Sequence, residues 1–137
     1  MATSLKNDLV PDVDEFRLRR FVDRMIDEGE VEVVDEPVAL ADVAARMDGN
    51  EKAVLFRQAG PEKAELIGSM TGGRRRMAKA FGVEPGDLLT EVNRRLATPQ
   101  EVVELDSGDA PVHEVILTGD DVDLTRLPVH LQHEMDG

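Results

Sequence analysis

Helix-like and strand-like hydrophobic patterns alternate along this chain, and that alternation most restricts its fold. The first helix-like pattern opens near Asp12, and its apolar residues repeat at i, i+3, i+4, i+7 and i+8: Leu18, Phe21, Val22, Met25 and Ile26. Its acidic start (Asp12, Asp14 and Glu15) suits the positive end of a helix dipole, and Gly29 can cap its end. A short valine-rich strand is predicted over 31–34.

Five further elements are predicted over residues 40–96. They are a helix over 40–47, strands over 53–56 and 65–70 joined by a turn at 58–62, and helices over 74–81 and 85–96. In the last helix we expect an inward face made by Leu88, Leu89, Val92 and Leu96. The two strands can form a hairpin. The element order predicts the α/β (α+β) class, a small mixed β-sheet with helices packed on it.

The last third of the chain changes character. Residues 112–117 are strand-like, residues 118–121 are expected to turn, and residues 124–131 are expected to be extended and interrupted by Pro128. We therefore divide the chain into a flexible N-terminus (1–11), an α/β domain (12–100) and an extended β segment (101–137).

Charge excludes several classes of partner. The 137 residues fit one domain and hold 29 acidic and 16 basic side chains, a net charge of −13. Such a surface repels nucleic acid and anionic membranes, because binding phosphates requires a basic face. Only four of the basic residues are Lys. The composition fits either a protein adapted to high salt or an ordinary acidic protein, and both interpretations stay open.

The chain has no cysteine, which excludes disulfides, thiol nucleophiles and thiolate metal sites. Residues 1–10 lack the apolar run of a signal peptide, and no stretch approaches the roughly 18 apolar residues of a membrane span. We therefore predict a cytoplasmic location.

Two histidines near the end could suggest a metal site. His130 and His133 lie three residues apart, with Glu134 and Asp136 close by. One helical turn could bring the two imidazoles to one ion, but Pro128 and the strand-like context disfavour a helix. In a strand, residues three apart point to opposite faces. A polar loop is the preferred interpretation.

The run Thr71-Gly72-Gly73-Arg74-Arg75-Arg76 could bind an anion. Glycines before a helix expose free N–H groups, and the three arginines add positive charge. The spacing is not that of a P-loop. In so acidic a chain, arginines acting as intramolecular ion-pair partners are the preferred interpretation.

Carboxylates adjacent in sequence could form an acid–base pair, at Asp35/Glu36 or among Asp120, Asp121 and Asp123. A working pair needs unlike environments that separate the two pKa values, and acids exposed in turns do not provide them. No motif of a hydrolase, metalloprotease or dinucleotide-binding protein occurs. The residues alone therefore give little support to catalysis.

Several segments, in order, resemble UbiD-family decarboxylases. Residues 18–37 are similar to the opening helix of that family and its strand ending in DEPV, and residues 53–56 to its ALLF strand. Residues 67–83, IGSMTGGRRRMAKAFGV, resemble its NLFGSRERMALALG segment, with Ser69 where the family tends to have Asn. Residues 111–137 resemble the stretch that leads to its DGG junction. The resemblance covers residues 18–137.

The resemblance implies reversible, non-oxidative decarboxylation of aromatic or α,β-unsaturated acids. It implies prenylated FMN as cofactor, bound with Mn²⁺ and K⁺ and made by a partner flavin prenyltransferase, and a homo-oligomeric enzyme. The catalytic, flavin and metal residues of the family lie beyond the DGG junction, in a split-barrel flavin-binding domain. We therefore assign no catalytic, cofactor-binding or metal-binding residue to this chain, and we expect no cofactor to bind it alone.

Two hypotheses follow. In the first, the chain is the N-terminal part of a UbiD-like decarboxylase, with residues 101–137 beginning the flavin-binding domain, and it is inactive without the remaining domains. In the second, it is a stand-alone, non-catalytic binding or assembly module. The open end at Gly137 favours the first.

Overall fold

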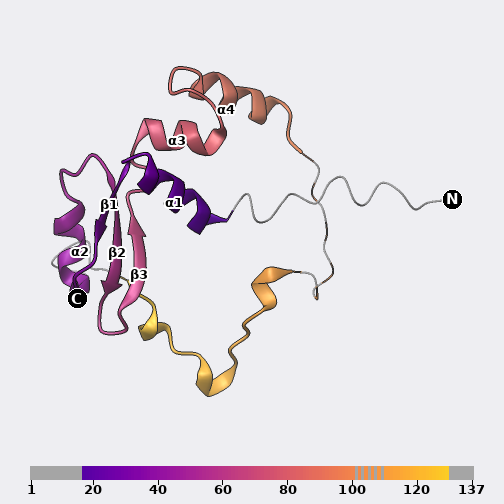
Figure 1. Ribbon diagram of the computed structural model, residues 1–137. Helices are drawn as coiled ribbons and strands as arrows, with labels where there is room; N and C mark the ends of the chain where they lie inside the picture. Colours follow the sequence, from indigo (N-terminus) through magenta and orange to yellow (C-terminus); the bar gives the residue numbers. More distant parts are fainter. Residues whose placement is uncertain are drawn as a thin grey trace.

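The computed structural model describes residues 17–100, 102, 104, 106, 108 and 110–129 (Figure 1). Its main elements are α1 (Leu18–Asp27), β1 (Val31–Val34), α2 (Leu40–Met47), β2 (Ala53–Ala59), β3 (Ala64–Gly68), α3 (Arg74–Phe81) and α4 (Leu88–Ala97). The three strands form one sheet in the order β1-β2-β3. Strands β1 and β2 are parallel, whereas β2 and β3 form the predicted antiparallel hairpin. The small mixed sheet with helices packed on it is therefore confirmed.

The sheet is covered on both faces. Figure 1 shows α1 and α2 on opposite sides of it. Alternate residues of β2 point to opposite faces, so Leu55 packs with Val22 and Met25 of α1, whereas Phe56 packs with Val43 of α2. Each helix thus buries one side of the same strand, and β2 is the centre of the core.

Strand β2 is longer than the sequence predicts. It continues past Phe56 to Ala59 through an irregular register, because the chain after β1 stays beside it. Val38 forms a parallel bridge with Ala59, and its N–H donates to the carbonyl of Gln58 at 3.0 Å. Tertiary pairing therefore replaces the first half of the predicted turn.

Helix α1 has the predicted buried stripe and the predicted end. Val22 and Met25 are buried, and Gly29 follows the helix with a φ of +75°, a backbone region that glycine enters easily. The helix begins at Leu18 rather than near Asp12. The three acids expected at its start lie outside the described residues.

Helices α3 and α4 form a unit beside the sheet (Figure 1). Helix α4 starts at Leu88, three residues later than predicted, since Glu84–Asp87 forms a turn closed by the Asp87 N–H and the Glu84 carbonyl. Of its predicted inward face only Leu88 is buried. Leu89 and Leu96 are 65% and 74% exposed, so the prediction for them was wrong. Neither α3 nor α4 contributes to the two core clusters around the sheet.

The predicted strand over 112–117 is absent. Short 3-10 turns occur instead at Pro111–His113, Gly119–Asp121 and Leu124–Arg126, the last within a stretch expected to be extended. A strand needs a hydrogen-bonded neighbour, and no described strand pairs with this segment. The turn predicted over 118–121 is confirmed.

Candidate functional site

The arginine run begins helix α3, and its third member folds back into the protein. Arg76 is 2% exposed and is the one buried charged side chain among the described residues. A Cβ atom added to Gly73 would lie 2.6 Å from the Cζ atom of Arg76. The guanidinium therefore fills the space beside the helix N-terminus, and the absence of a side chain at Gly73 makes that position possible.

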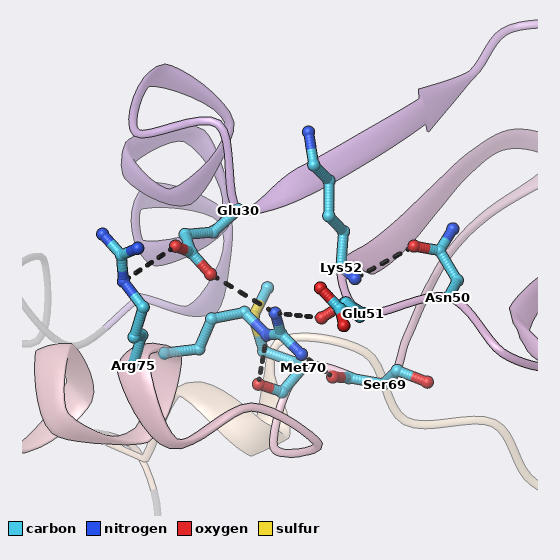
Figure 2. Close-up of polar contacts among 8 residues, drawn as sticks. Glu30, Asn50, Glu51, Lys52, Ser69, Met70 and Arg75 are labelled. Carbon is cyan, nitrogen blue, oxygen red and sulfur yellow. Dashed lines mark hydrogen bonds and ion pairs between the residues drawn. The ribbon is translucent and has the colours of Figure 1, made fainter. Parts of the chain in front are cut away.

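Three carbonyl groups and one carboxylate receive the Arg76 guanidinium. Its Nε donates to the carbonyl of Met70 at 3.3 Å, and its Nη2 donates to that of Ser69 at 3.2 Å. Its Nη1 donates to the carbonyl of Glu51 at 3.0 Å and lies 3.5 Å from the Glu30 carboxylate (Figure 2). The side chain thus ties α3 to the β3–α3 loop, to the chain entering β2 and to the residue before β1.

Glu30 also pairs with the neighbouring arginine. The Nε of Arg75 lies 3.2 Å from its other carboxylate oxygen, so the carboxylate lies between two guanidinium groups (Figure 2). Lys79 pairs with Glu28 at 3.2 Å, and the Nε of Arg74 donates to the carbonyl of Pro85 at 2.8 Å. The arginine run therefore acts as intramolecular partners, the interpretation preferred from the sequence.

An open depression of about 470 Å³ adjoins this network. Acidic and basic residues line it together, including Glu28, Glu30 and Glu51 opposite Lys52 and Arg75. A flavin phosphate would meet these carboxylates, and it would find the Arg76 donors already bonded to carbonyl groups. The residues present therefore do not fit a phosphate-bearing cofactor.

A second depression, of about 350 Å³, lies between α1 and the sheet, where Leu18, Val22 and Ile67 meet Arg57 and Glu65. Arg57 and Glu65 pair with each other at 3.0 Å across the hairpin. The pair is exposed and offers no acid or base in an unusual environment.

The other predicted site residues do not come together. His130, His133, Glu134 and Asp136 lie outside the described residues. Within the described part of the chain, no three His, Asp or Glu side chains are grouped closely enough to hold a metal ion. No described helix is long and apolar enough to cross a membrane.

The acidic pairs serve the fold where they make contacts. Glu36 pairs with Arg46 of α2 at 3.5 Å. The side chain of Asp123 accepts hydrogen bonds from the Thr125 hydroxyl and N–H, and the first of these lowers the pKa of Asp123. Asp35, Asp120 and Asp121 are exposed. The structure gives no support to an acid–base pair.

Glu91 carries the largest pKa shift for which a value is resolved. Its carboxylate accepts from Arg94 and Arg95 at 2.7–2.8 Å, and these hydrogen bonds lower its pKa to about 2. Arg95 also donates to the carbonyl of Phe81 and lies over its ring. This cluster joins α4 to α3 and has the character of a structural contact.

Sequence reasoning missed the Arg76–Glu30 network. The two residues are 46 positions apart, and nothing in a run of three arginines distinguishes the buried one. The available signal was the pair of glycines before the run, because they leave room for a side chain that folds back.

Fold and site together define a small α/β domain whose buried charged centre stabilises the fold and leaves no free donors for a ligand. The chain belongs to the UbiD family, since residues 22–96 match the 3-octaprenyl-4-hydroxybenzoate carboxy-lyase N-terminal domain. The match covers more than half of the chain and includes the sheet and helices α2 and α3.

A solved structure has the same fold. It is an evolved dimeric form of the UbiD-class enzyme HmfF from Pelotomaculum thermopropionicum, in complex with prFMN. The TM-score is 0.70 at 22% sequence identity, and the alignment covers 84% of this chain. The chain spans 28% of the length of that HmfF chain.

Proposed function

We propose that this chain works as the N-terminal part of a UbiD-like carboxy-lyase. The reaction would be reversible, non-oxidative decarboxylation of an aromatic or α,β-unsaturated carboxylic acid. The family match over residues 22–96 carries the proposal. The HmfF structure holds prFMN, which supports prenylated FMN as the cofactor of such an enzyme.

Chemistry in the proposed enzyme belongs to the parts that this chain does not match. The described residues contain no metal-binding group of acids and histidines, and the arginine run is bonded to the protein itself. Prenylated FMN, with Mn²⁺ and K⁺, would therefore bind the flavin-binding domain. The role of the described residues would be to fold and to dock that domain.

Two partners follow from this proposal. The first is the flavin-binding and C-terminal part of the enzyme, on the same or a separate chain. The second is a flavin prenyltransferase that supplies the cofactor. The HmfF structure is a dimer, which supports a homo-oligomer for the complete enzyme.

Co-expression tests the proposal. The chain is produced with the flavin-binding part encoded beside it and with a flavin prenyltransferase, and affinity purification is directed at the chain alone. We expect both polypeptides to co-purify with the absorbance of a bound flavin. Purification of the chain without the flavin-binding part would contradict the proposal.

A stand-alone binding module is the second candidate function, favoured by the exposed apolar face of α4. It predicts that the chain purifies as a folded protein and ignores the flavin-binding part. The same co-expression distinguishes the two functions.

A further inference from the structure

Helix α4 has an apolar face that nothing in the described structure covers. Leu89, Val92 and Leu96 lie at i, i+3 and i+7, so they share one side of the helix. The two leucines are 65% and 74% exposed, and Val92 is half-buried. Leu88 alone faces inward and is buried. Adjacent leucines this exposed on one helix form a patch that favours a partner.

A second uncovered apolar surface lies in the segment 112–129. Eight of its side chains are large, apolar and at least half exposed: Val112, Val115, Ile116, Leu117, Val122, Leu124, Leu127 and Val129. Its printed backbone hydrogen bonds are local, within the 3-10 turns and their neighbours. The sequence pattern suits a strand, and the segment lacks a surface to pack on.

The two surfaces carry opposite charge. Residues 74–97, which contain α3 and α4, hold six of the 16 basic side chains against three acidic ones. Residues 112–129 hold four acidic side chains against one basic one, Arg126. Attraction between them is therefore favourable at the scale of the two elements, although the whole chain is acidic.

Figure 1 places the segment at the opposite end of the molecule from α4. We propose that the two surfaces meet between molecules: the α4 face formed by Leu89, Val92 and Leu96 docks segment 112–129 of a second copy, and the exchange is reciprocal. A reciprocal exchange closes as a two-fold dimer and covers both apolar surfaces of each chain. The proposed function would engage the same segment in a flavin-binding domain, so the two assemblies exclude each other.

Sedimentation velocity of the full chain at increasing concentration tests the dimer. The salt concentration is set at about 0.15 M, which screens the repulsion between two acidic copies beyond about 8 Å. We expect a monomer–dimer equilibrium that the double substitution Leu89→Ser/Leu96→Ser weakens at least tenfold. Leu18→Ser is the matched control, since Leu18 is 57% exposed on α1 and should leave the equilibrium unchanged. Circular dichroism confirms that each variant folds.

Cross-linking tests which surfaces meet. The chain has no cysteine, so Leu96→Cys and Ile116→Cys each introduce a single thiol. The two variants, carrying tags of different size, are mixed and treated with a short bismaleimide. We expect a hetero-dimer cross-link between them, and a much weaker one when Ala45→Cys on α2 replaces Leu96→Cys.

A monomer at every concentration would overturn the proposal. So would a dimer that keeps its affinity in the Leu89→Ser/Leu96→Ser variant, or one that cross-links equally through Ala45→Cys. These measurements use the chain alone and no flavin-binding part, so their outcome is independent of the proposed decarboxylase.

Discussion

At the scale of single residues, Arg76 organises more of the structure than any other charged side chain described. Its guanidinium bonds to the carbonyls of Ser69, Met70 and Glu51, which lie in two loops that β-strand pairing alone would not fix to α3. Arg75 touches the same Glu30 carboxylate from solvent, with 74% of its side chain exposed. The two neighbours therefore separate a buried role from a surface one.

Substitution by lysine should expose this difference. Arg76→Lys keeps the charge but loses the planar fork, so two or more buried carbonyls lose their donors. We expect the free energy of unfolding to fall by about 2–4 kcal/mol. Arg75→Lys is the matched control and should change it by less than about 0.5 kcal/mol. Urea denaturation measures both, and equal losses would argue against a special role for Arg76.

Gly73 gives a second residue-scale prediction. In Gly73→Ala the new methyl group would meet the Arg76 guanidinium at 2.6 Å, so the guanidinium must leave its carbonyl partners or the helix must shift. We expect a loss of about 1–3 kcal/mol in the free energy of unfolding. Gly86→Ala serves as control, because no atom lies within 4 Å of its added Cβ. A stable Gly73→Ala protein would show that the contact relaxes freely.

At the scale of elements, helix α4 depends on one acidic side chain. Glu91 binds Arg94 and Arg95 on its own helix, and Arg95 continues to Phe81 of α3. Because its pKa is lowered to about 2 in the folded protein, Glu91 stabilises the folded state at pH values above the usual range of a glutamate. That contribution disappears as the pH falls toward 2.

The pH dependence can be isolated with Glu91→Gln. At pH 7 the substitution should lower the stability of the protein, and the difference from the natural sequence should shrink steadily as the pH falls from about 5 to about 2. Denaturant unfolding at several pH values measures it. Glu84→Gln, an exposed change in the turn before α4, reports the effect of removing a charge alone. A difference that does not vary with pH would contradict the assigned shift.

The elements also show how far the sequence could predict the fold. The stripe of α1, the hairpin and helices α2 and α3 followed from periodicity and glycines, because each depends on neighbours in the chain. The outward leucines of α4 did not, since the pattern gives a helical face but not whether a partner exists to cover it. The missing strand at 112–117 has the same cause. For the site, the backbone supplies one later explanation: Ser69 has a φ of +57°, a region where asparagine is favoured.

At the scale of the whole molecule, the net charge of −13 dominates. Most of the printed ion pairs join neighbouring elements at the surface, and they offset only part of the repulsion among 29 acidic residues. Screening by salt should therefore stabilise the folded chain.

Thermal unfolding in dilute buffer and in about 2 M KCl tests this effect. If the acidity is an adaptation to high salt, the melting temperature should rise by more than about 5 °C, corresponding to roughly 1 kcal/mol for a domain of this size. An unchanged or lower melting temperature would favour an ordinary acidic protein.

The central claim is that this chain is the N-terminal part of a decarboxylase whose chemistry belongs to other domains. Release of CO₂ from a panel of aromatic and α,β-unsaturated acids tests it most directly, with the chain alone, the flavin-binding part alone and the two reconstituted with prenylated FMN. We predict no release by the chain alone and a rate in the reconstituted sample well above that of the flavin-binding part. Decarboxylation by the chain alone, or a reconstituted rate no higher than that of the flavin-binding part, would contradict the account.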